Sequence, residues 1–260
     1  MVDVKLVIPP LSRRLVAEGL GTALLVTVVV GSGIAAQRLS PDDVGIQLLE
    51  NSTATAFGLG VLILVFGPVS GAHFNPVVSA ADWLLGRRTG SGLRGRDVAP
   101  YSIAQFLGGI SGAVLANLMY DLPAIQISAN ERSSGPVLLA EVVATAGLVT
   151  VIFALVRSGR AVLVAAAVGA YIGAAYWFTS STSFANPAVT VGRIFSDTFA
   201  GIAPSSVTAF VLAQVVGGGL GVLLIRFLYP TVAGRPEDVT AHVASDRRGS
   251  DMRASDARDA

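Results

Sequence analysis

The chain has 260 residues, of which 52% are hydrophobic and 13% are charged, and its mean hydropathy is +0.66. Because a soluble domain carries about 25% charged residues, this composition predicts a polytopic membrane protein. A net charge of +1 gives no argument for a nucleic-acid partner, and the lack of cysteine excludes disulfides, thiol catalysis and thiolate metal sites. Only His73 and His242 are present, so we expect no histidine-rich metal site and no cofactor.

Six apolar segments are long enough to cross a bilayer as helices, which takes about 20 residues each. Two further apolar pieces, which begin at Asn75 and Asn186, are too short to cross and fit re-entrant half-helices. We therefore expect an all-α membrane protein with six transmembrane helices and two half-helices. The six predicted spans are approximately 15–36, 48–67, 99–120, 137–156, 161–179 and 207–228.

All of these spans fall within 1–232, the predicted membrane domain. The remaining residues, 233–260, are charged and rich in small residues, so we expect a disordered tail. Without the distal tail, eleven lysines and arginines lie on the side of the two termini, and three, Arg38, Arg132 and Arg193, lie on the other. We expect the protein to lie in the inner (plasma) membrane of the cell. The positive-inside rule then places both termini, and with them the tail, in the cytoplasm.

The sequence of the membrane domain repeats itself, at about 14–120 and 137–229. Each half has three spans, so the second half inserts upside down and forms an inverted repeat. The two half-helix starts then face each other near the middle of the membrane. The matching marks are Ala17-Glu18 and Thr22 with Ala140-Glu141 and Thr145, and Gln105, Gly108 and Gly109 with Gln214, Gly217 and Gly218.

The half-helix starts carry a tripeptide that occurs twice, Asn75-Pro76-Val77 and Asn186-Pro187-Ala188. Asparagine is a good N-cap, and proline is favoured at the first position of a helix. A helix that begins inside a bilayer is tolerated only where its backbone lines a cavity or is covered by protein. Two such starts indicate a pore or a binding site at the midplane of the membrane.

Two carboxylates, Glu18 and Glu141, lie in the first span of each half. A carboxylate within a span costs roughly 2.5–3.5 kcal/mol, so it needs a partner. One interpretation is a proton or ion relay, and the other is a buried strut that accepts hydrogen bonds from the re-entrant loops. The symmetric placement favours the strut, and the same interpretation applies to Gln105 and Gln214.

His73 directly precedes the first half-helix start in the sequence Ser-Gly-Ala-His-Phe-Asn-Pro-Val at 70–77. A lone histidine in an apolar protein could be a packing residue. Its place in the re-entrant loop favours a side chain that faces the pore.

This octapeptide, with the second Asn-Pro-Ala at the matching place, resembles the aquaporin (major intrinsic protein) family over about 14–229. The resemblance implies one pore per subunit, a homotetramer, and small neutral solutes that accept hydrogen bonds from the side chains of Asn75 and Asn186. It also implies that backbone carbonyls form a ladder of acceptors along the pore, from Gly71, Ala72 and His73 and from Thr182, Ser183 and Phe184.

The chain departs from the family pattern at the selectivity filter. Most members have an arginine directly after the second Asn-Pro-Ala, whereas this chain has Val189. Counting back from the second motif places other filter positions at Ala174 and Ser183, and the fourth at Thr55 or, alternatively, Phe57. A filter of this kind has no charge and little bulk, so we expect it to be wide.

Arg193 lies one helical turn beyond Val189. Two interpretations stay open for it. It could partly restore the missing charge at the vestibule, or it could be a loop arginine that reaches to the membrane interface.

Channels without the filter arginine resemble a bacterial aquaglyceroporin-like subgroup associated with arsenic resistance. The resemblance implies a passive channel for water- and glycerol-sized solutes and for undissociated arsenous acid or methylated arsenicals. An ion-coupled small-solute carrier is the alternative, but the residues beside the two motifs include no carboxylate. An enzyme is not expected, because the re-entrant loops lack a nucleophile–base pair.

Overall fold

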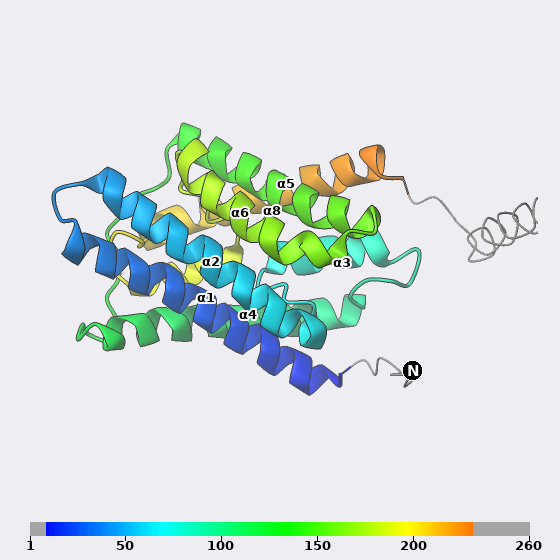
Figure 1. The fold of residues 1–260 in the computed structure, drawn as a ribbon, viewed down its shortest axis with the longest axis horizontal. Coiled ribbons are helices and arrows are strands. Elements are labelled where there is room, and N and C mark those ends of the chain that lie inside the picture. Colours follow the sequence, from blue (N-terminus) through cyan, green and yellow to red (C-terminus); the bar gives the residue numbers. More distant parts are fainter. Residues whose placement is uncertain (1–8, 231–260) are drawn as a thin grey trace, which may run out of the picture. The chain divides into compact units, whose positions relative to one another are not determined.

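The computed structural model describes residues 9–230, so the predicted tail at 233–260 lies outside the described residues. The described part of the chain is all-helical, and six of its helices are long and apolar enough to cross a membrane, as predicted. The long helices run side by side along the bundle (Figure 1). They are α1 (Leu11–Leu39), α2 (Val44–Ser70), α4 (Gly95–Met119), α5 (Gly135–Arg157), α6 (Val164–Phe178, preceded by the short helix η1, Ala161–Leu163) and α8 (Pro204–Leu228).

The two half-helices begin at the Asn-Pro motifs, α3 at Pro76–Gly86 and α7 at Pro187–Gly192, the latter continued by η2 (Arg193–Phe195). Each start is capped by its own asparagine. The side-chain oxygen of Asn75 accepts a hydrogen bond from the amide of Val77 at 2.9 Å, and that of Asn186 accepts one from the amide of Ala188 at 2.9 Å. With proline at the first position, both helices begin where the sequence predicts.

The two halves pack in the same way, because α1 lies against α4 as α5 lies against α8. Glycines make both contacts possible. A Cβ atom at Gly108 would collide with the carbonyl of Gly19, and one at Gly217 would collide with the carbonyl of Val142. Small residues that let helix backbones approach closely are typical of membrane helix interfaces.

The two halves of the repeat also pack against each other through the half-helices. A Cβ atom at Gly109 of α4 would lie 2.5 Å from the carbonyl of Ala188 in α7. In the same way, Gly218 of α8 leaves room for the side chain of Val77 in α3. Each half-helix therefore packs on the last long helix of the other half, which is the arrangement expected of an inverted repeat.

We predict that Gly217→Val destabilises the protein, because the added side chain would meet backbone that cannot move away. Overpacking of this kind costs about 2–3 kcal/mol. Gly219→Val on the same helix is the matched control, since a Cβ atom there meets nothing within 4 Å and the residue is exposed. Thermal unfolding of the detergent-solubilised variants measures the difference. Equal midpoints for the two would contradict the predicted α5–α8 contact.

Candidate functional site

A cavity of about 550 Å³ lies where the two half-helix starts meet. Asn75 and Asn186 both line it, and so do side chains of α1, α2, α5 and α6. It extends from the region of η1 to the last turn of α6. The structure thus brings the two Asn-Pro motifs, 111 positions apart in the sequence, to one site.

The two asparagines are cross-bonded between the halves. Asn75 Nδ2 donates to the carbonyl of Ala185 at 2.7 Å, and Asn186 Nδ2 donates to the carbonyl of Phe74 at 2.7 Å. A primary amide has two N–H groups, and each side-chain oxygen is already occupied as an N-cap. Each asparagine therefore keeps one N–H that can donate to a molecule in the cavity.

The backbone before each asparagine is held in an unusual conformation. The φ angles are positive at Ala72 and Phe74 (50° each), and at the matching positions Ser183 (49°) and Ala185 (48°). Non-glycine residues rarely adopt this left-handed conformation, which costs of order 1 kcal/mol or more each. The repeated pattern turns the carbonyl groups of the two loops away from any helical hydrogen-bonding partner.

The carbonyls of the predicted ladder are without donors among the hydrogen bonds formed within residues 9–230. Three of the six residues, Ala72, Ser183 and Phe184, are buried, and buried carbonyl groups without partners are rare because an unmade hydrogen bond is costly. A solute in the cavity can supply the donor. Five of the six ladder residues line the cavity, namely Gly71, Ala72, His73, Ser183 and Phe184, whereas Thr182 is not among the lining residues.

Two buried carboxylates hold these loops in place. Glu18 accepts hydrogen bonds from the amides of His73 (3.0 Å) and Phe74 (2.7 Å). Its side chain also accepts from the hydroxyl of Ser70 at 2.6 Å and from Gln105 Nε2 at 2.7 Å. All of these donors compensate the buried charge, as a strut requires.

Glu141 repeats the arrangement in the second half. It accepts hydrogen bonds from the amides of Phe184 (2.9 Å) and Ala185 (2.8 Å), and from Gln214 Nε2 at 2.7 Å. The side chains of Glu141 and Gln214 are fully buried, like those of Glu18 and Gln105. A carboxylate with this many donors is not poised to bind and release an ion.

His73 lines the cavity, and its Nδ1 lies 3.1 Å from Ser79 Oγ. Its Nε2 lies 3.6 Å from Oδ2 of Asp82, which lines the cavity as well. Asp82 is a carboxylate of the cavity that the sequence analysis missed, because it lies two turns along α3 and not beside the Asn-Pro motif. Its Oδ2 accepts a hydrogen bond from the amide of Leu93 at 2.7 Å, which ties it to the following loop.

The structure changes one of the predicted filter positions. Thr55, Ser183 and Val189 line the cavity, but Ala174 is exposed on the outside of α6. On the same helix Tyr176 faces inward, and its hydroxyl lies 3.2 Å from Thr55 Oγ1.

The prediction of Ala174 was therefore wrong by half a turn of helix, because residues two positions apart point to opposite sides. Phe57, the alternative to Thr55, is 74% exposed on α2, so the structure favours Thr55. We call Thr55, Tyr176, Ser183 and Val189 the filter group. It is uncharged, as expected, but the tyrosine makes it bulkier than expected.

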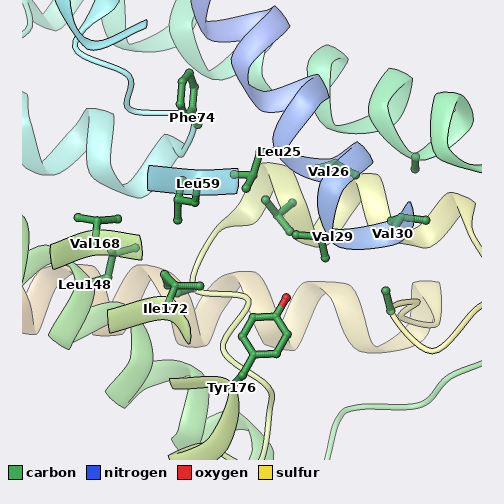
Figure 2. Close-up of a cluster of buried hydrophobic side chains, with 14 of the residues drawn as sticks. Leu25, Val26, Val29, Val30, Leu59, Phe74, Leu148, Val168, Ile172 and Tyr176 are labelled. Atoms are coloured by element: carbon green, nitrogen blue, oxygen red, sulfur yellow. The ribbon is translucent and has the colours of Figure 1, made fainter. Parts of the chain in front are cut away.

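Six apolar side chains from the long helices form another part of the cavity wall. Figure 2 shows these six side chains turned toward one another. The cavity therefore combines hydrogen-bonding groups, including the hydroxyls of Thr55 and Tyr176, with a cluster of hydrocarbon side chains. The apolar wall consists of Leu25 and Val29 of α1, Leu59 of α2, Leu148 of α5, and Val168 and Ile172 of α6.

Arg193 does not reach to the membrane interface, because only 2% of its surface is exposed. That finding excludes one of the two interpretations of this residue. Its guanidinium carbon lies 3.4 Å from the centre of the Phe184 ring, and its Nε donates to the carbonyl of Ala200.

An inverted repeat whose half-helices meet in a half-polar, half-apolar cavity defines a membrane channel for small solutes. The family model described as Major intrinsic protein matches residues 5–184. Aquaglyceroporin AqpS of Rhizobium meliloti is 50% identical over 218 residues, which cover 84% of this chain and 91% of that protein. The chain therefore belongs to the major intrinsic protein family. It is a passive channel for water- and glycerol-sized solutes and not an enzyme.

Two further comparisons agree with this membership. Aquaporin Z of Photorhabdus laumondii is 36% identical over 125 residues, which cover 47% of this chain and 49% of that protein. The X-ray structure of the aquaglyceroporin from Plasmodium falciparum matches with a TM-score of 0.64 at 21% identity. That match covers 86% of this chain and 98% of the other, and it shows the shared fold.

We predict that Glu141→Gln lowers the free energy of unfolding by about 3 kcal/mol, because the new amide group would face N–H donors that it cannot satisfy. Glu131→Gln, at an exposed glutamate, is the matched control. Thermal unfolding in detergent gives the stability. Water flux at several pH values gives a second measurement, and a strut predicts that residual flux keeps its pH dependence. If the variant folded normally and lost only pH dependence, Glu141 would be a relay.

Proposed function

We propose that the physiological solutes of this channel are undissociated arsenous acid and methylated arsenicals, with water and glycerol as competing solutes. The observation that carries this proposal is the division of the cavity into an apolar wall and a row of unpaired carbonyls. A neutral molecule with several hydroxyl groups can donate to the carbonyls while its remaining surface, or a methyl group, lies against the hydrocarbon side.

The two asparagines complete the path for such a solute. After the cross-bonds and the caps are made, Asn75 and Asn186 each have one N–H left to donate. A hydroxyl that donates to a ladder carbonyl can accept from this N–H at the same time. These contacts replace the lost hydration of a neutral molecule, but they cannot compensate the larger hydration energy of an ion.

The filter group supports solutes wider than water. Val189 occupies the position where most of the family has an arginine, and its side chain cannot bridge the path as a guanidinium can. Thr55 and Tyr176 add hydroxyl groups that exchange hydrogen bonds with a polyol or an oxyacid. The resemblance to channels associated with arsenic resistance, which also lack this arginine, supports the same solutes.

An ion-coupled carrier is a less favoured hypothesis for the function than a channel. Glu18 and Glu141 are saturated with hydrogen-bond donors, so Asp82 is the carboxylate in the cavity to which such a mechanism would turn. A carrier predicts saturable flux that depends on the proton gradient. A channel predicts flux that rises linearly with the solute gradient.

We also propose that the protein is a homotetramer in the inner (plasma) membrane with both termini in the cytoplasm. The eleven basic residues on the side of the termini, against three on the other, support this orientation. Chemical cross-linking in membranes tests the tetramer, and reactivity of cysteines introduced at exposed loop positions tests the orientation.

We expect proteoliposomes that contain the protein to take up arsenous acid, glycerol and water faster than empty vesicles do. Stopped-flow swelling measures all three under identical osmotic gradients, with urea as a fourth neutral solute. Flux of water and glycerol without arsenous acid flux above that of empty vesicles would overturn the arsenic proposal and leave the channel intact.

We predict that Val189→Arg reduces glycerol flux roughly tenfold or more while water flux persists, because the guanidinium would narrow the filter group. Val189→Leu is the control for bulk without charge, and it should reduce glycerol flux less. Swelling assays with both solutes measure the ratio. Unchanged glycerol flux in Val189→Arg would mean that this position does not border the narrow part of the path.

A further inference from the structure

Arg193 is a buried cation beside the pathway. It follows Val189 by four residues, so both side chains lie on the same face of α7 and η2. Because side chains on a helix lean toward its N-terminus, that of Arg193 covers the turn nearer to position 189. Its guanidinium carbon lies 3.4 Å from the centre of the Phe184 ring, and Phe184 lines the cavity together with Val189.

A second cation, Arg132 from the loop before α5, joins the same ring. Its guanidinium carbon lies 5.2 Å from the centre of Phe184. Its Nε donates to the carbonyl of Gly201 at 2.9 Å, and its Nη2 donates to the carbonyl of Phe199 at 3.1 Å. Arg193 donates to the carbonyl of Ala200, which lies between Phe199 and Gly201 in the chain. The two arginines together therefore bind three consecutive carbonyls of one loop.

The charge of this arginine pair, Arg132 and Arg193, is not cancelled by an ion pair within the described residues. Glu141 is a nearby carboxylate whose oxygens accept from two neutral backbone amides and Gln214, so its single negative charge offsets one of the two positive charges and leaves the group net positive. The side chain of Arg193 is fully buried, and its terminal nitrogens donate no hydrogen bond to the described residues. A buried guanidinium of this kind projects its field into its surroundings.

We propose that Arg193, supported by Arg132 across the ring of Phe184, supplies the cation barrier that the uncharged filter group lacks. The inference rests on the proposed channel function and adds a determinant of its selectivity. In this proposal the guanidinium of Arg193 lies behind the ring of Phe184, beside the pathway, whereas an arginine at position 189 would project into it. The pathway stays wide enough for a polyol or an oxyacid, while cations and protons still meet a positive potential.

The experiment compares Arg193→Gln with the unaltered protein in proteoliposomes. A unit charge about 8 Å from a permeating cation, at an effective dielectric near 20, changes the rate of cation passage by a factor of roughly 30. Since Arg132 remains, we expect proton leak to rise by about tenfold in Arg193→Gln. An imposed valinomycin potential with an internal pH dye measures the proton leak, and stopped-flow swelling measures water and glycerol flux on the same vesicles.

Three further variants make the outcome specific to charge. Arg88→Gln removes an exposed arginine in the turn after α3 and should leave the leak unchanged. The double variant Arg193→Gln/Val189→Arg returns a positive charge to the filter group and should restore the low leak. Restoration in this variant but not in Arg193→Gln/Val189→Leu, which adds bulk without charge, would separate an electrostatic role of Arg193 from a structural or steric one.

The failures are distinguishable. If neutral solutes cross and Arg193→Gln leaks no more than the unaltered protein, the inference is overturned and the channel function stands. If the unaltered protein conducts no neutral solute, the proposed function itself fails. If Arg193→Gln cannot be recovered in membranes, Arg132→Gln decides, since it removes the half-exposed member of the pair: a severalfold rise in leak supports the inference, and none overturns it.

Discussion

The reciprocal hydrogen bonds of two asparagine side chains hold the functional part of this protein together. Asn75 and Asn186 each donate across the pseudo-symmetry axis to the carbonyl directly before the other. Each also caps its own half-helix with its side-chain oxygen. One polar residue type thus ends a loop, begins a helix and joins the halves of the chain. The proline that follows costs nothing there, because the first helical N–H has no intrahelical partner.

This junction makes the pathway possible because it forces the adjoining loops into a conformation that no helix could offer. Left-handed residues give the two loops this conformation, and the two glutamates counterbalance the strain by accepting hydrogen bonds from the loop amides. The backbone amides thereby have partners inside the protein, whereas the carbonyls of the predicted ladder have none within the described residues. The buried carboxylates and the acceptor ladder are two sides of the same peptide groups.

The sequence was sufficient to predict features that depend on local patterns. The six spans, both half-helices and the inverted repeat follow from hydrophobic length and from the spacing of Asn-Pro, glutamate and glycine, and the structure has them. Ala174 failed because counting from Asn186 assumes a loop of fixed length, whereas the helix rotates Tyr176 into the site. Asp82 and the stacking of Arg132 and Arg193 on Phe184 could not be predicted either. Asp82 lies two turns along α3 from the motif, and Arg132 reaches Phe184 from a loop 52 residues earlier, so no local pattern encodes those contacts.

The cross-bonds also constrain the order in which the chain can assemble. The amide of Asn75 needs the carbonyl of Ala185, which is synthesised more than a hundred residues later. Gly218, which leaves room for the side chain of Val77, is synthesised still later, in the last long helix, α8. While the first half alone is in the membrane, its re-entrant loop has Glu18 but neither of these partners. The pathway can therefore be completed only as a late step of biogenesis, after α8 has entered the bilayer.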